Sequence, residues 1–207
     1  MLLGIDTCGA TGSIALAGWC AGELRLLAED ELAGKTYSAQ LTPKIQQLLE
    51  AQQSSPQDLQ AIVVVHGPGS FTGVRVGLSA AKGLADALHV PLLAVSRLAI
   101  LASKAGTGAA ALDAGRGEFY FRIGRDEALL TPEEIRARVS GEIGVCEETA
   151  AQAFPEAVRV AFPTAGDALH YARTRLASGD YDDAAGIDGN YVRRSDAELF
   201  ARHGARR

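Results

Sequence analysis

The sequence predicts an α/β fold of two subdomains, one at residues 1–100 and a smaller one at 101–207. The first observation behind this expectation is a run of three strand-like segments, 2–7, 12–17 and 23–32, separated by short turns. The second is the alternation that follows, in which helical apolar spacing and continuous apolar runs succeed one another. The third is a weaker hairpin signature early in the second half.

Each element of the first half has its own local signal. The turn 8–11 contains a glycine between two apolar runs, which indicates a β-hairpin. Apolar residues recur at helical spacing over 37–49 and predict an amphipathic helix. The uninterrupted apolar run 61–65 is typical of a buried strand. A helix over 72–88 and a strand over 91–95 complete the order β-β-β-α-β-α-β.

The second half is patterned more weakly. Thr131, Pro132 and Glu134 form a good helix start, with an N-cap, a proline at the first helical position and a capping-box glutamate. Ser96 is expected to cap a short helix that runs to Lys104. The other predicted elements are a hairpin with strands at 109–112 and 118–123, strands at 142–146 and 159–162, and a helix at 164–177.

The order of the elements is that of the opening of an actin/Hsp70/sugar-kinase-like domain. In that architecture two α/β halves face each other across a nucleotide cleft. Asp6 ends the first predicted strand, where an acidic residue in such folds can approach a phosphate-bound cation. The alternative is that its carboxylate stabilises the turn by accepting hydrogen bonds from local backbone N–H groups, and we favour this alternative.

A glycine-rich turn, 66–73, joins the buried strand to the following helix. Gly67 and Gly69 allow a tight turn, and Ser70 or Thr72 can cap the helix. Unpaired N–H groups at such a helix start can hold an anion, so Asp6, Gly67, Gly69 and Ser70 are candidate nucleotide-binding residues. No lysine follows as in a phosphate-binding GK[ST] loop, which favours tight backbone packing as the role of the turn.

The helix over 72–88 is unusually rich in small residues. Interior glycines such as Gly73 and Gly77 each cost roughly 0.5–1 kcal/mol relative to alanine, so a close contact must offset that cost. The contact is either with a partner or with the helix's own domain, and the sequence leaves both open. The apolar stripe of this helix consists of Val74, Leu78, Ala81, Ala85 and Leu88.

Composition narrows the class of protein. Of the 207 residues, 47% are apolar and 22% charged, which excludes extensive disorder, and the net charge of −5 does not indicate a nucleic-acid surface. Three cysteines without CxxC spacing suggest reduced, buried thiols, and with no apolar run of membrane-helix length we expect a cytoplasmic protein. Positive charge is concentrated at the C-terminal tail, which is either a solvated end or a contact with RNA or an acidic partner. The arginines there are Arg193, Arg194, Arg202, Arg206 and Arg207.

The segment 67–85, GPGSFTGVRVGLSAAKGLA, resembles the hallmark of the TsaB (YeaZ) family. These bacterial proteins take part in making N6-threonylcarbamoyladenosine at position 37 of tRNAs that read ANN codons. Tyr37 departs from the family pattern, which usually has histidine there, so any role of that imidazole does not carry over. Further similar segments are 3–7, 38–45, 112–120 and 191–193, so the resemblance spans nearly the whole chain and is loose only over 124–188.

The resemblance implies a non-catalytic subunit that binds and activates TsaD, the threonylcarbamoyl transferase, alongside the ATPase TsaE. It implies no cofactor of its own, with ATP and magnesium at the assembled complex, tRNA bound only through the complex, and no membrane contact. In the family, the helices corresponding to 37–49 and 72–88 form a bundle with the partner, or a homodimer in its absence. The implied partner-binding residues are Tyr37, Leu41, Ile45, Gly73, Val74, Gly77, Leu78 and Ala81.

Two other classes of function stay open. One is an enzyme, either a glycoprotease or an ATP-dependent phosphotransferase. The chain lacks the HxxxH motif of TsaD, its four histidines have no metal-ligand spacing, and no catalytic Asp–Lys set is recognisable, which argues against both. The other is an interaction protein unrelated to tRNA, for which the sequence offers no positive feature.

Overall fold

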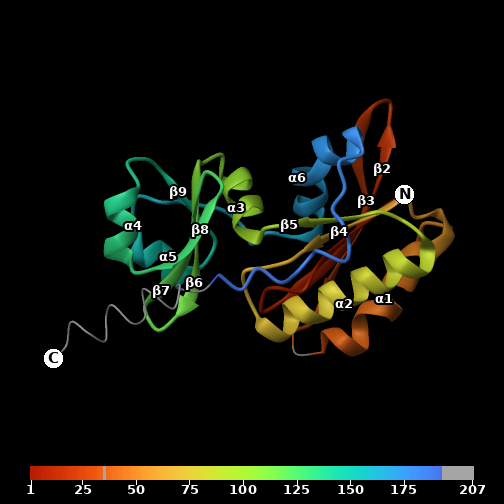
Figure 1. The fold of residues 1–207 in the computed structure, drawn as a ribbon, viewed down its shortest axis with the longest axis horizontal. Coiled ribbons are helices and arrows are strands. Elements are labelled where there is room, and N and C mark those ends of the chain that lie inside the picture. The colour runs from red at the N-terminus through yellow and green to blue at the C-terminus, as the bar shows by residue number, and fades with distance from the viewer. Residues whose placement is uncertain (35, 193–207) are drawn as a thin grey trace.

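The computed structural model describes residues 1–34 and 36–192, which form two sheets of five strands each. Figure 1 shows the two sheets side by side along the long axis of the molecule, with α3 between them. The arginines noted at the tail, from Arg193 onward, lie outside the described residues. The expected actin/Hsp70/sugar-kinase-like fold of two α/β subdomains is confirmed.

The first sheet has the strand order β3-β2-β1-β4-β5. Its strands are β1 (Leu2–Asp6), β2 (Gly12–Cys20), β3 (Glu23–Leu32), β4 (Ala61–Val65) and β5 (Leu92–Val95). The three-stranded meander is antiparallel, and β4 and β5 add to it in parallel. Every residue of β1 and β4 is buried because helices cover both faces of the sheet.

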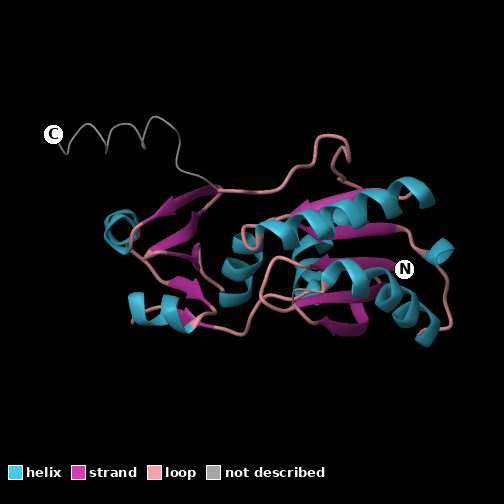
Figure 2. Cartoon of the chain, turned by 90° about the horizontal axis from the view of Figure 1, so that it is seen from below, coloured by secondary structure: helices cyan, strands magenta, loops and turns pink. Residues whose placement is uncertain are grey.

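Three helices enclose this sheet. Helices α1 (Tyr37–Ala51) and α2 (Phe71–Leu88) cover one face, and α6 (Ala165–Ser178) covers the other (Figure 1). Figure 2 views the molecule from the side of α1 and α2. A short 3-10 helix, η1 (Pro56–Asp58), leads into β4.

The second sheet has the order β10-β9-β6-β7-β8. Its strands are β6 (Ala109–Gly115), β7 (Glu118–Ile123), β8 (Asp126–Leu130), β9 (Ile143–Val145) and β10 (Val158–Arg159). The apolar side chains of α3 pack against it, and two short helices complete the subdomain. The three helices here are α3 (Arg97–Ala105), α4 (Pro132–Arg138) and α5 (Glu148–Ala153).

The path of the chain differs from the expected division at residue 100, which falls inside α3. After the second sheet the chain returns to the first, because the apolar stripe of α6 finds its cover on β1 and β2. The first core therefore includes late residues, namely Ala165, Ala168, Leu169, Ala172, Leu176 and Ile187. The first subdomain is thus discontinuous in sequence.

Some smaller expectations were wrong. The last strand is Val158–Arg159 rather than 159–162, because its partner β9 offers only three residues. Cys8 and Cys146 are buried as expected, but Cys20 is exposed at the β2–β3 turn. No helix among the described residues is long and apolar enough to cross a membrane.

Candidate functional site: a cleft between the subdomains and a groove between two helices

A cleft of about 640 Å³ lies where the two subdomains meet. The first subdomain contributes the loop after β1 and the starts of α1 and α2 to its lining. Arg97 enters from the start of α3, and the second subdomain contributes Asp113, Tyr120 and Glu147. A cleft between two α/β halves agrees with the architecture expected from the sequence.

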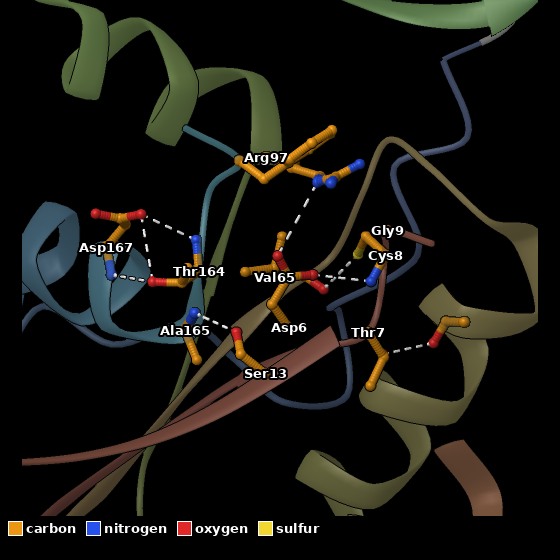
Figure 3. A network of polar contacts seen from close by, with 12 residues as sticks. Asp6, Thr7, Cys8, Gly9, Ser13, Val65, Arg97, Thr164, Ala165 and Asp167 are labelled. Carbon is orange, nitrogen blue, oxygen red and sulfur yellow. Dashed lines mark hydrogen bonds and ion pairs between the residues drawn. The ribbon is translucent and has the colours of Figure 1, made fainter. Parts of the chain in front are cut away.

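Asp6 is held by its own neighbourhood (Figure 3). The carboxylate is 2% exposed, accepts a hydrogen bond of 2.8 Å from the Cys8 backbone N–H, and lies 4.0 Å from Arg97 Nε. Burial raises the pKa of Asp6, and the nearby Arg97 guanidinium opposes that rise. The geometry matches the turn-stabilising role, and Asp6 is not part of the cleft lining.

The glycine-rich turn packs against the loop after β1. Ser70 N donates to Cys8 O at 2.8 Å, and Ser70 Oγ caps α2 by accepting from Gly73 N at 3.2 Å. A Cβ at Gly69 would lie only 2.3 Å from Cys8 O. Of the four candidate nucleotide-binding residues, Gly69 and Ser70 line the cleft, whereas Asp6 and Gly67 do not.

The small residues of α2 bring this helix close to the end of β1. Thr7 Oγ1 donates to Gly73 O at 2.7 Å, a bond drawn in Figure 3. A Cβ at Gly73 would lie 2.0 Å from Thr7 O, and one at Gly77 would lie 2.3 Å from Thr7 Oγ1. The sequence left open whether the small residues of α2 contact a partner or their own domain. Gly73 and Gly77 contact their own domain.

The eight residues expected to bind the partner are all buried within the chain, which corrects that expectation. Their stripes fix α1 and α2 onto the first sheet, and the Tyr37 hydroxyl donates to Gly9 O at 2.9 Å. Of the eight, only Leu41 lines the groove on the solvent side of these helices, and the other residues of that groove were not among those expected. The buried residues are Tyr37, Leu41, Ile45, Gly73, Val74, Gly77, Leu78 and Ala81.

The solvent side of α1 and α2 forms a groove of about 450 Å³, which we call the helix groove. Phe71 is 46% exposed at one end of it, and the Arg75 guanidinium stacks 3.9 Å from the centre of its ring. Tyr191 also contacts Phe71, with ring centroids 5.1 Å apart, and accepts a hydrogen bond from Arg75 Nε at 3.3 Å. The rest of the groove is lined by Leu41, Val76 and five short side chains, among them Ser79 and Ala80.

The buried thiols are poorly suited to nucleophilic attack. Burial raises the pKa of Cys8 well above its ordinary value and that of Cys146 to about 12, so both stay protonated at neutral pH. Cys8 Sγ instead donates to Val65 O at 3.2 Å. In the part of the chain that the structure describes, no three histidine, cysteine, aspartate or glutamate residues are grouped to hold a metal ion.

Sequence reasoning missed Arg97 and Glu147 as lining of the cleft. Arg97 follows the N-cap Ser96 in an apolar helix, a position at which an arginine is ordinarily solvated. Glu147 precedes α5, a helix of six residues that has no clear periodicity. Both residues can be assigned to the cleft only from the three-dimensional arrangement of the two sheets.

Two α/β subdomains facing each other across a cleft define a protein of the actin/Hsp70/sugar-kinase class. The family model of TsaD, the tRNA N6-adenosine threonylcarbamoyltransferase, matches residues 30–171. The tRNA threonylcarbamoyladenosine biosynthesis protein TsaB of Escherichia coli K12 is 34% identical, over 86% of this chain and 88% of its own length. The TsaB protein of Bacillus subtilis 168 is 38% identical, over 58% of this chain and 52% of its own length.

A solved structure of YeaZ from Pseudomonas aeruginosa matches with a TM-score of 0.75 at 29% identity, over 92% of this chain and 99% of that one. The similarity to the Escherichia coli protein in sequence, and to the Pseudomonas aeruginosa protein in fold, thus extends over most of the length of both compared chains. The chain belongs to the TsaB (YeaZ) family.

Proposed function

We propose that the chain is the subunit that binds and activates TsaD in the formation of N6-threonylcarbamoyladenosine at position 37 of ANN-decoding tRNAs. Membership of a family whose curated members are named for threonylcarbamoyladenosine biosynthesis supports the pathway. The activator itself carries out no transfer. TsaE joins the assembly, ATP and magnesium act there rather than on this subunit alone, and tRNA is bound by the complex in the cytoplasm.

The observation that carries the proposal is the helix groove. It combines a half-exposed aromatic ring, Phe71, with an arginine stacked on that ring and a lining in which most of the other side chains are short. Aromatic residues and arginine are enriched among residues that dominate binding energy, and short side chains let a partner's helices approach closely. In the absence of TsaD, a second copy of the chain covers the same surface.

The surface can be tested by crowding the groove at Ser79 and at Ala80, of which Ala80 also packs against the first core. Ser79 is exposed and Ala80 half-buried in the groove, so Ser79→Arg and Ala80→Arg place bulk where the partner docks. We expect each substitution to weaken TsaD binding about 10- to 100-fold, the cost of overpacking at a close contact. Isothermal titration with purified TsaD measures the affinity.

A matched control lies on the same helix. Ala87 is exposed near the C-terminal end of α2 and does not line the groove, so Ala87→Arg leaves the affinity unchanged. Unchanged binding by both groove variants, with melting temperatures equal to that of the wild type, would exclude this surface. Loss of binding by Ala87→Arg to the same degree would show that added charge, rather than the groove, is responsible.

A further inference from the structure

Arg97 is a buried cation with few partners. Its side chain is 7% exposed, and Nε lies 4.0 Å from Asp6 Oδ2 without a hydrogen bond. Figure 3 shows the guanidinium above Asp6, on the side of Cys8 and Gly9. The terminal nitrogens have no hydrogen bond to any residue in 1–34 or 36–192. A Cβ at Gly9 would lie 2.7 Å from Nη2, so a glycine makes room for this group.

The buried guanidinium of Arg97 requires hydrogen-bond acceptors. A guanidinium carries five N–H donors, and buried polar groups in proteins are nearly always satisfied by protein, water or a bound ligand. Arg97 lines the cleft, so an acceptor can reach it there. The first turn of α2 is adjacent: Ser70 and Thr72 also line the cleft, and the start of an 18-residue helix favours negative charge.

The lining of the cleft also carries negative charge. Asp113 and Glu147 both line it, and Arg97 is the sole cation among the described lining residues. One oxygen of each carboxylate accepts a backbone hydrogen bond, Asp113 Oδ1 from Gly115 N and Glu147 Oε2 from Asp113 N. The second oxygen of each has no hydrogen-bond partner in the described part of the chain.

We propose that the cleft binds a small zwitterion of the α-amino acid class. Its carboxylate pairs with Arg97 beside the start of α2, and its ammonium group pairs with the open oxygens of Asp113 and Glu147. A simple anion would face two carboxylates and a simple cation would face Arg97, whereas a zwitterion offers a partner to each sign of charge in the lining. A cleft of about 640 Å³ holds an amino acid with its side chain. The cleft adjoins the helix groove, because Ser38, Thr72 and Val76 line both, but the proposed binding needs only this chain and not TsaD.

The experiment uses the purified full chain and ligand-observed NMR with pools of the twenty L-α-amino acids, followed by titration of any hit. Propionate, ethylamine and inorganic phosphate are probes that each carry only one kind of charge. We expect saturable binding of at least one amino acid, with the three single-charge probes at least tenfold weaker. Failure to bind any amino acid at millimolar concentration, or equal binding of propionate or phosphate, would overturn the proposal.

Two variants test separately the groups that bind the carboxylate and the ammonium group of the ligand. Arg97→Lys keeps the charge but loses the planar fork, and Glu147→Gln keeps an oxygen that accepts from Asp113 N. We expect each to weaken the amino acid about 10- to 100-fold, as loss of a charge-assisted hydrogen bond does. Glu156→Gln, at an exposed position outside the cleft, leaves binding unchanged. If Arg97→Lys does not fold, Glu147→Gln alone decides, and unaltered affinity in that variant refutes the zwitterion site.

Discussion

At the scale of single residues, Thr7 explains why α2 contains glycine at two consecutive turns. Its hydroxyl donates to Gly73 O at 2.7 Å and lies 2.3 Å from where a Cβ of Gly77 would be. Backbone proximity offsets the cost of glycine in a helix, and the same contact positions the capped start of α2 at the cleft. Gly83 of the same helix has nothing within 4 Å of such a Cβ, so it has no equivalent role in packing.

The two glycines therefore respond oppositely to alanine. Gly77→Ala forces a methyl group against Thr7 Oγ1 and should destabilise the chain by about 1–3 kcal/mol. Gly83→Ala meets open space and should stabilise it by roughly 0.5–1 kcal/mol through helix propensity. Chemical denaturation of the isolated chain measures both. Stabilisation by Gly77→Ala would contradict the packing described for α2.

Glu147 gives stability a pH dependence. Burial raises the pKa of its carboxyl above the ordinary 4.5, while Arg97 and the hydrogen bond from Asp113 N oppose the rise. A group whose pKa is raised on folding contributes its stability below the unfolded pKa and loses it as pH rises through the folded value. Glu147→Gln removes this loss, so the variant should gain stability relative to wild type as pH increases from about 4.5 to 7. Parallel curves of unfolding free energy against pH would contradict this assignment.

At the scale of elements, periodicity identifies which side chains share a face but not what covers that face. The stripes of α1 and α2 are buried as their spacing predicts, yet the cover is the chain's own sheet. The spacing of the small residues in α2 could not distinguish a contact with the chain's own sheet from a contact with a partner protein. Capping residues were more informative because their effect is local: Ser70, Ser96 and Thr131 all cap the helices predicted for them.

Elements without a strong local signal were not predictable. The strand β8 begins with two acidic residues, and α5 has only six residues, so neither shows a period. Both form because neighbouring strands and the second core hold them, a tertiary effect that outweighs propensity. A cleft between the two halves was expected, but none of its described lining residues in the second half was predicted as a site residue, whereas Gly69 and Ser70 of the first half were.

The capping box of α4 can be measured by one substitution. Thr131 Oγ1 accepts from Glu134 N, and Glu134 Oε2 accepts from Thr131 N at 2.7 Å. Thr131→Ala removes half of this pair and should destabilise the chain by about 0.5–2 kcal/mol in denaturant unfolding. Thr174→Ala, at an exposed position inside α6, is the matched control and should be neutral or slightly stabilising. Equal effects of the two substitutions would mean that the cap contributes nothing.

At the scale of the whole molecule, Glu127 of β8 ties the two subdomains together. It accepts hydrogen bonds from Ser96 at the start of α3, from Arg122 Nη1 at 2.6 Å, and from Asn190 in the segment that returns beside β4 and β5. The same returning segment binds the first subdomain, since Asn190 N donates to His66 O at 2.7 Å and Lys82 Nζ to Ile187 O at 2.6 Å. Through these contacts the returning segment joins the two subdomains.

Removing Glu127 should therefore be costly. The side chains of Arg122 and Glu127 are only 15% and 11% exposed, so Glu127→Ala leaves a buried guanidinium unpaired and should cost about 3–5 kcal/mol. Glu133→Ala is the control, because its ion pair with Arg136 spans 3.7 Å between side chains 79% and 54% exposed and should contribute less than about 1 kcal/mol. Unfolding free energies of both variants test this, and a small loss on Glu127→Ala would show that the subdomains are held by apolar packing instead.

The central claim, that the helix groove activates TsaD, is tested most directly by threonylcarbamoyladenosine formation on tRNA in a reconstituted mixture. The mixture contains TsaD, TsaE, ATP, magnesium, the threonylcarbamoyl donor and an ANN-decoding tRNA, with and without this chain. We predict product only when the wild-type chain is present, a loss of at least tenfold with Ala80→Arg at limiting concentration, and full activity with Ala87→Arg. Full activity with Ala80→Arg, or product formed by this chain when TsaD is omitted, would contradict the account.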